Sequence, residues 1–269
     1  MKVRRAAPAP VADDTPADPE EHVRPFVSET LDARTLYFSV SAIQSRMRVQ
    51  HADTLDLEYT RLMMAFLLFN PKPPQIALIG LGGGSLVKFC HRHLLHSALT
   101  VAEINPHVVA LREAFDVPAD DARLRVITTD GAHLVRDSST CFDVLLVDGF
   151  DRDGLPKALR SQRFYDNCAD VLQPGGLLVA NLHQDRLHCD TYVERMRRSF
   201  AGAVLLVDDS DGSNRVVFAW KGEHPPLLTA AAVARCTGMS AAACAPLLPA
   251  FARVRSAMGL LRDAPLRAD

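Results

Sequence analysis

The stretch Ile76-Ala77-Leu78-Ile79-Gly80-Leu81-Gly82-Gly83-Gly84-Ser85 is an apolar run that ends in glycines, and the chain continues as Leu86-Val87-Lys88-Phe89-Cys90. This pattern predicts a buried strand, a tight turn and a helix. Glycines at such a turn let backbone N–H groups approach a ligand, and the N-terminus of the following helix favours electron-rich groups. Close packing of a helix against a strand also selects glycine. We interpret the turn as a nucleoside site and look for further evidence.

Three more predicted strands, at residues 99–104, 124–129 and 142–147, carry or precede an acid. The acids are Glu103, Asp130 and Asp148. Strands that alternate with helical segments predict an α/β protein with a doubly wound, Rossmann-like sheet, in which ligands bind outside the carboxyl ends of the strands. Glu103 follows the glycine turn by about 20 residues, the position from which this fold class binds a ribose. Each acid taken alone also fits a solvated loop or a helix cap.

The order of several short motifs along the chain is informative: Gly82-Gly83-Gly84, Ala102-Glu103-Ile104-Asn105, Asp130-Gly131, the run from Asp143 to Asp148, Arg163-Phe164-Tyr165 and the run from Leu172 to Gly176. In these motifs the sequence resembles spermidine synthase and its relatives, from about residue 35 to residue 220. The resemblance implies the fold of the S-adenosylmethionine-dependent methyltransferases. It also implies transfer of an aminopropyl group from decarboxylated S-adenosylmethionine to a small-molecule amine.

The same resemblance implies a role for individual residues. Glu103 would bind the ribose hydroxyls and Asp130 the adenine amino group. Asp148 corresponds to the catalytic acid that orients the attacking amine and accepts its proton, and Asp151 to a second acid that binds the charge of the amine. Tyr59 and Tyr165 would frame the acceptor pocket. The full set of implied donor-binding residues is Gly80, Gly82, Gly83, Gly84, Ser85, Glu103, Asp130 and Gly131.

The sequence departs from the family pattern at three places. Ser85 stands where the synthases have an aspartate that binds the ammonium of the donor, and Thr60-Arg61 replaces a histidine and a glutamate. The loop after Asp148 contains an added arginine, Arg152. These departures leave three functions open: an aminopropyltransferase, a methyltransferase that uses intact S-adenosylmethionine, and a non-catalytic relative that binds a nucleoside or a protein partner.

Composition narrows the class of protein further. The 269 residues are 48% hydrophobic, enough for one sizeable α/β core, and the net charge of −2 predicts no binding to nucleic acid or to an anionic membrane. The six cysteines show no Cys-x-x-Cys pair or zinc-ligand spacing, so we expect no metal site. We expect the donor as a co-substrate, an amine as the second substrate and, from the family, a homo-oligomer.

The chain divides by pattern into four regions. Residues 1–22 are rich in Ala, Pro and acids without the apolar core of a signal peptide, which predicts a disordered leader and a cytoplasmic protein. Residues 23–70 predict a short β-hairpin and a helix, and residues 71–222 the nucleoside-binding catalytic domain. Residues 223–269 predict a helical segment, which we expect to pack on the core or on a partner subunit.

Overall fold

The computed structural model describes residues 22–39, 42–150, 154–183, 188–223 and 226–263. The predicted leader, up to residue 21, and Asp151 lie outside the described residues.

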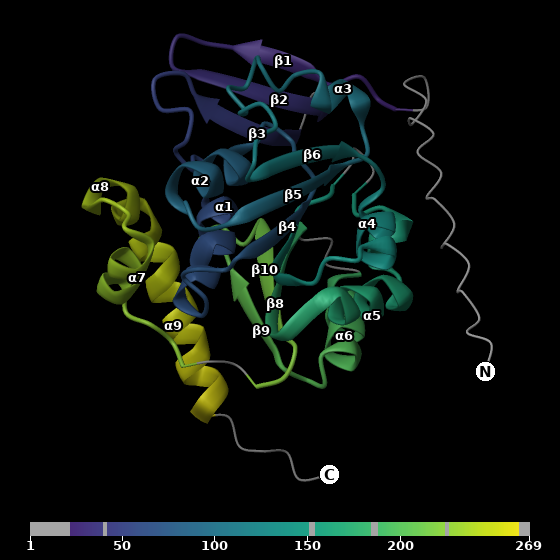
Figure 1. Cartoon of the computed structure of the whole chain (residues 1–269), viewed down its shortest axis with the longest axis vertical. Coiled ribbons are helices and arrows are strands. Elements are labelled where there is room, and N and C mark those ends of the chain that lie inside the picture. The colour runs from purple at the N-terminus through teal and green to yellow at the C-terminus, as the bar shows by residue number, and fades with distance from the viewer. Residues whose placement is uncertain (1–21, 40–41, 151–153, 184–187, 224–225, 264–269) are drawn as a thin grey trace, which may run out of the picture.

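A seven-stranded sheet forms the centre of the molecule, in the order β6-β5-β4-β7-β8-β10-β9 (Figure 1). Strands β4 to β8 pair in parallel, and β10 pairs antiparallel with both β8 and β9. The strands are β4 (Gln75–Ile79), β5 (Ala98–Glu103), β6 (Leu124–Thr128), β7 (Phe142–Val147), β8 (Leu172–His183), β9 (Val204–Asp208) and β10 (Asn214–Trp220). The Rossmann-like sheet predicted from the sequence is therefore confirmed.

Strand order reverses at β4, which has β5 on one side and β7 on the other. The chain first adds β5 and β6 on one side and then returns to add β7 and β8 on the other. In an open α/β sheet a crevice forms at this switch point, outside the carboxyl ends of the strands. The glycine turn follows β4 directly, so the turn lies at the mouth of this crevice.

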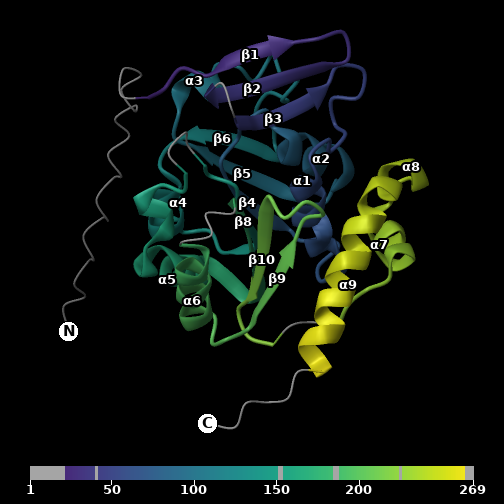
Figure 2. The same cartoon turned by 180° about the vertical axis from the view of Figure 1, so that it is seen from behind.

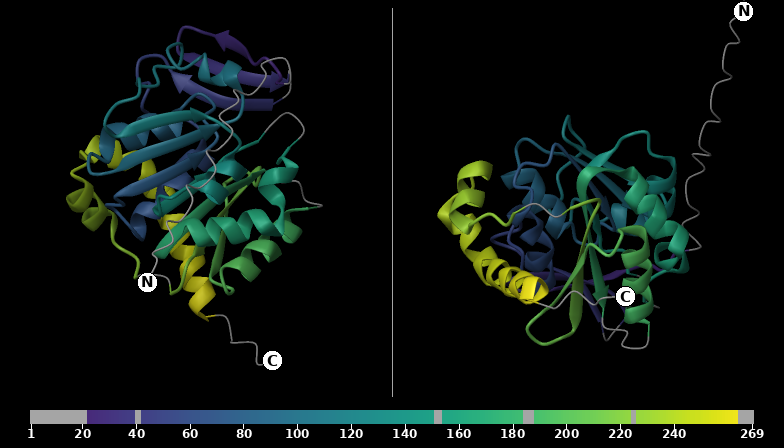
Figure 3. Two further views of the ribbon diagram at one scale, coloured as in Figure 1. Left: turned by 45° about the vertical axis from the view of Figure 1, so that its right-hand side comes forward. Right: turned by 90° about the horizontal axis from the view of Figure 1, so that it is seen from below.

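Alternation along the strands separates two apolar layers. In β4, Ile76 and Leu78 face one layer, whereas Ala77 and Ile79 face the other. The first layer is covered by α2 (Ser85–His93), α1 (Glu58–Met63) and the C-terminal helices, and the second by α4 (Gly131–Asp137), α5 (Gln162–Val171) and α6 (Cys189–Ser199). Figure 3 shows the yellow C-terminal helices and the green helices on opposite sides of the sheet.

A separate three-stranded sheet precedes the first helix and consists of β1 (Phe26–Glu29), β2 (Ala33–Ser39) and β3 (Ala42–Arg48). The hairpin expected from the sequence corresponds to β2 and β3, whereas β1 is an additional strand that we did not predict. All four β1 residues are exposed, so the strand has no alternating pattern to reveal it. The helix expected after the hairpin is a short α1 that tightens into the 3₁₀ helix η2 (Met64–Leu68).

The C-terminal segment folds into α7 (Ala230–Thr237), α8 (Ala241–Cys244), η4 (Ala245–Leu247) and α9 (Leu248–Asp263). Its apolar residues Val233, Leu247, Phe251 and Val254 are buried in the same core as α1 and η2. Figure 2 shows α9 running beside β9. This segment therefore packs on the core of its own chain, one of the two alternatives expected. Among the described residues, no helix is long and apolar enough to cross a membrane.

Candidate active site

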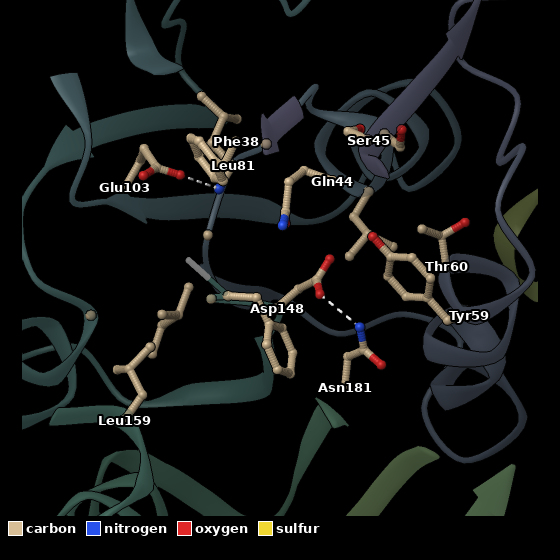
Figure 4. Close-up of a pocket in the computed structure, with 18 of the residues that line it drawn as sticks. Phe38, Gln44, Ser45, Tyr59, Thr60, Leu81, Glu103, Asp148, Leu159 and Asn181 are labelled. Atoms are coloured by element: carbon tan, nitrogen blue, oxygen red, sulfur yellow. Dashed lines mark hydrogen bonds between the residues drawn. The ribbon is translucent and has the colours of Figure 1, made fainter. Parts of the chain in front are cut away.

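A cavity of about 710 Å³ opens at the carboxyl ends of β4, β5 and β7 (Figure 4). The three-stranded sheet covers one side with Phe38, Gln44 and Ser45, and α1 contributes Tyr59 and Thr60. Among the predicted site residues, those that line the cavity are Tyr59, Gly80, Gly82, Ser85, Glu103, Asp130, Gly131 and Asp148.

Gly80 brings the ends of β4 and β7 into close contact. It has a φ of +93°, and a Cβ at this position would lie 2.2 Å from the backbone oxygen of Asp148. The Asp148 N–H donates to the Ile79 carbonyl oxygen at 2.8 Å, which fixes the approach. Only glycine fits this contact, because both the dihedral angle and the space exclude a side chain.

Gly83 and Gly84 do not line the cavity, contrary to expectation. A Cβ on Gly83 would lie 2.7 Å from Ser45 Oγ, and a Cβ on Gly84 would lie 2.3 Å from a methyl group of Val117. These two glycines let the N-terminal sheet and the loop before β6 pack against the turn. The triple glycine therefore combines one cavity-lining residue, Gly82, with two packing residues.

Glu103 lies at the end of β5 and is 7% exposed. Its carboxylate accepts hydrogen bonds from the Leu81 N–H at 2.8 Å and the Asn105 N–H at 2.9 Å. Burial raises the pKa of Glu103, and the backbone N–H groups of Leu81, Asn105 and Gly82 oppose that rise. The carboxylate thus ties the glycine turn to β5 and presents an acceptor to the cavity.

Asp130 both lines the cavity and caps α4. Its Oδ1 accepts a hydrogen bond from the Ala132 N–H at 2.8 Å, so the helix-cap alternative is correct for this oxygen. Gly131 begins the helix where a Cβ would lie 2.2 Å from a methyl group of Ile79. A glycine here lets α4 approach the end of β4.

Asp148 follows β7 and holds the centre of the cavity (Figure 4). Its Oδ1 accepts a hydrogen bond from Asn181 Nδ2 at 2.9 Å, and its carboxylate accepts another from the Tyr59 hydroxyl. Burial raises the pKa of Asp148, and these two hydrogen bonds oppose that rise. Burial and the charge of Asp148 also raise the pKa of Tyr59 well above its ordinary value, so the phenol remains a donor. The three side chains form a fixed proton-accepting group.

The structure corrects the expectation for Tyr165. This residue lies on α5, is 1% exposed and packs edge-on against Phe164 with 5.4 Å between the ring centroids. It belongs to the apolar layer on the far face of the sheet and does not line the cavity. The Arg163-Phe164-Tyr165 motif located the residue in the sequence, but it did not determine whether the Tyr165 side chain faces the cavity or the apolar layer.

The residues that depart from the family pattern differ in whether they line the cavity. Ser85 begins α2, is 8% exposed and lines the cavity. Thr60 Oγ1 donates to the Leu57 carbonyl oxygen at 2.6 Å. Arg61 donates to the carbonyl oxygens of Leu55 and Asp56 at 2.7 and 2.9 Å, and it is not among the lining residues. These hydrogen bonds hold the Arg61 guanidinium outside the cavity lining, where it would otherwise repel a cationic substrate.

Sequence reasoning missed several cavity residues. Asn181 is a buried polar residue within the apolar strand β8, and this break in an apolar run was the available signal. The turn between β9 and β10 also contributes Asp209, Asp211 and Ser213, which no motif marked. Among the described lining residues, the ionisable side chains apart from His22 and Tyr59 are all carboxylates, and none is Lys or Arg. They are Glu58, Glu103, Asp130, Asp148, Asp209 and Asp211.

These features define the class of protein: an α/β protein with a nucleoside-type crevice whose charged lining favours a cationic ligand. In the part of the chain that the structure describes, no group of three or more His, Cys, Asp or Glu side chains is placed to hold a metal ion.

A family model for the spermine/spermidine synthase domain matches residues 57–205, more than half of the chain. The chain is 33% identical to a polyamine aminopropyltransferase of Chromobacterium violaceum over 204 residues, which cover 76% of this chain and 77% of that protein. The chain belongs to the spermine/spermidine synthase family.

Solved structures agree on the fold. A probable spermidine synthase from Corynebacterium glutamicum matches with a TM-score of 0.66 at 20% identity, covering 79% of this chain and 82% of that one. Human methyltransferase-like protein 13, solved in complex with SAH, matches with a TM-score of 0.58 at 22% identity, covering 79% and 96%. The fold is therefore the one that spermidine synthases and methyltransferases share.

Proposed function

We propose that this protein is an aminopropyltransferase, which moves the aminopropyl group of decarboxylated S-adenosylmethionine to the nitrogen of a small amine. The observation that carries the proposal is the Asp148 carboxylate, held by Tyr59 and Asn181 inside a cavity whose described lining has carboxylates and no Lys or Arg. Both substrates are cations, and such a lining attracts cations.

The donor fits the nucleoside half of this cavity. An ionised carboxylate has hydrogen-bond acceptors and no donor. Glu103 would therefore accept hydrogen bonds from the ribose hydroxyls, and Asp130 would accept one from the adenine amino group. Ser85 offers a hydroxyl where the family resemblance implies an aspartate. We infer that the charge of the donor ammonium is balanced by the carboxylates across the cavity.

Transfer requires a neutral amine. An alkylamine has a pKa of about 10, so it is mostly protonated near neutral pH and cannot attack until it loses a proton. Asp148 takes that proton, and its raised pKa makes it a better acceptor than an exposed aspartate. The nitrogen lone pair then attacks the propyl carbon on the sulfonium. The C–N bond forms, the C–S bond breaks with its electron pair going to sulfur, and methylthioadenosine leaves neutral.

The alternative donor is intact S-adenosylmethionine, which carries an additional carboxylate. Position 85 is a serine rather than an aspartate, so this side chain would not repel the carboxylate of that donor. However, the other acids of the cavity would repel the donor carboxylate, and no described lining residue is a Lys or Arg that could pair with it. This balance favours the decarboxylated donor.

Calorimetric titration with both donors tests the proposal directly. We expect the decarboxylated donor to bind at least tenfold more tightly than intact S-adenosylmethionine, a difference of about 1.4 kcal/mol. We also expect mass spectrometry to detect the aminopropylated amine. Tighter binding of intact S-adenosylmethionine, together with a methylated product, would instead identify a methyltransferase.

Asp148→Asn separates chemistry from binding. We expect turnover to fall by about 10²-fold or more, while the affinity for methylthioadenosine stays close to that of the parent protein. The substitution retains the size of the side chain but removes the proton acceptor. Normal turnover by this variant would exclude Asp148 as the base.

A further inference from the structure

Lys88 is a buried cation that neither donor binding nor proton transfer, as described above, uses. It lies on α2, one turn after the cavity residue Ser85, is 4% exposed and is not among the described lining residues. An ammonium group is costly to bury unless protein partners compensate for the lost water. Its Nζ donates to the Phe115 carbonyl oxygen at 2.7 Å, so its hydrogen-bond partner belongs to the segment between α3 (Pro106–Val109) and β6.

The segment that Lys88 contacts packs directly on the glycine turn. A Cβ on Gly83 would lie 2.9 Å from the ring of Phe115, and a Cβ on Gly84 would lie 2.3 Å from a methyl group of Val117. Between these two residues, Asp116 has a φ of +52°, in the left-handed region that non-glycine residues rarely adopt. The backbone at residues 115–117 therefore has to be held in place for both contacts with the turn to form.

Arg34 of β2 is a second cation on the same segment. Its guanidinium donates to the carbonyl oxygen of Ala114, next to the oxygen that Lys88 contacts, and it forms an ion pair with Glu29 of β1 at 2.9 Å. The Phe115 N–H closes a helical turn with the Leu111 carbonyl oxygen at 3.1 Å. Carbonyl oxygens at the end of such turns lack N–H partners within the turn and attract cations. The two cations thus cap the end of the segment that supports the glycine turn.

The charges that face Lys88 come from three other parts of the chain. Asp116 and Asp53 favour the ammonium, and Arg34 disfavours it. Asp53 also forms ion pairs with Arg92 and His93 of α2. Burial outweighs the two carboxylates and lowers the pKa of Lys88 to about 8. The Lys88 charge can therefore be removed by a moderate rise in pH, whereas a guanidinium stays charged.

We propose that Lys88 is a positioning residue for the donor: its buried ammonium holds the Phe115 carbonyl and keeps residues 115–117 packed behind the glycine turn that lines the nucleoside half of the cavity. This inference rests on the proposed function, which places the nucleoside of the donor there. Lys88 lies outside the cavity and acts through Phe115 and Gly83. Loss of its charge leaves the Phe115 carbonyl without this donor and loosens the support of the turn.

The affinity for methylthioadenosine tests the proposal, because this neutral ligand reports the nucleoside site without an amine or a reacting carbon. At about pH 7, calorimetry should show about tenfold weaker binding to Lys88→Met than to the parent protein, since the charged hydrogen bond is lost. The donor KM should rise similarly, whereas kcat at saturating donor should stay close to the parent value, because Asp148 is unaltered.

The pH dependence of the same affinity separates this role from simple packing. In the parent protein, binding should weaken as the pH rises through about 8, because the Lys88 ammonium is lost there. Lys88→Arg should bind with nearly the parent affinity at neutral pH and lose the alkaline decrease, because its guanidinium stays charged. Lys88→Met should bind weakly without an alkaline decrease.

Lys221→Met is the matched control. Lys221 also donates to a backbone carbonyl oxygen, that of Leu172 at 2.7 Å, but it follows β10 and is not among the lining residues. This variant should keep the parent affinity and its pH dependence. Parent-like binding by Lys88→Met, or an alkaline decrease that Lys88→Met retains, would overturn the inference while the nucleoside site stands. A parent protein that does not bind methylthioadenosine would instead contradict the proposed function. Trp220 fluorescence shows whether each variant is folded.

Discussion

Asp148 illustrates how single residues acquire their chemistry from neighbours distant in the sequence. The carboxylate follows β7, but its donors come from α1 and β8, through Tyr59 and Asn181. Burial raises the pKa of Asp148, so this carboxyl group ionises at a higher pH than an exposed aspartate does. The acid limb of the kcat/KM profile should therefore lie at higher pH than for an ordinary carboxylate.

Tyr59→Phe should move that acid limb to still higher pH. The Tyr59 hydroxyl donates to ionised Asp148 and thereby lowers its pKa, so loss of the hydroxyl raises the pKa further. Measurement of kcat/KM against pH checks the direction. Tyr37→Phe is the control, because Tyr37 stacks on Phe26 in the N-terminal sheet and does not line the cavity. A Tyr59→Phe profile that coincides with the Tyr37→Phe profile would contradict the assignment.

At the scale of elements, the glycine turn aligns the strand ends that carry the site. Gly80 lets the backbone of β4 meet that of Asp148, and Gly131 lets α4 reach Ile79. The sequence motif predicted the turn and its position correctly. It did not distinguish glycines that line the cavity from glycines that pack, because that distinction depends on Ser45 and Val117, which belong to other elements.

A pair of glycine substitutions measures the contact between the strands. Gly80 and Gly175 both have positive φ, but a Cβ on Gly175 would meet nothing within 4 Å. Gly175→Ala should cost about 1 to 2 kcal/mol of unfolding free energy, from backbone strain alone. Gly80→Ala should cost about 1 to 3 kcal/mol more, because the new methyl group displaces Asp148. Urea unfolding compares the two, and equal losses would exclude a steric role for Gly80.

At the scale of the whole molecule, the C-terminal helices share one core with the sheet. Leu247 and Val254 are buried with η2, and Phe69 of the same core contacts Trp220 of β10 with 5.0 Å between ring centroids. Arg253 of α9 also reaches Glu58, which holds the β9–β10 turn. The helices therefore support the β9–β10 turn, which contributes Asp209 and Asp211 to the cavity, as well as the fold.

Neighbouring leucines test whether this core unfolds as one unit. Leu247 is fully buried, whereas Leu248 is 47% exposed. Leu247→Ala should lower the unfolding free energy by about 2 to 5 kcal/mol, and Leu248→Ala should change it by no more than about 0.5 kcal/mol. The fluorescence of Trp220, the single tryptophan, reports unfolding of the sheet. A Trp220 transition that Leu247→Ala leaves unshifted would mean that the helices unfold separately.

The sequence by itself determined the α/β fold, the glycine turn and the carboxyl-end position of Glu103, Asp130 and Asp148, because apolar runs and turn chemistry are local properties of the chain. Only the tertiary structure decided which side chains meet. In the structure, Tyr165 lies in the far apolar layer and Arg61 donates to backbone carbonyl oxygens. Asn181 and Asp211 line the cavity. The physical reason is that the face a helix packs against the sheet and the pairing of strands both depend on contacts between residues far apart in sequence. A local sequence pattern contains no information on such contacts.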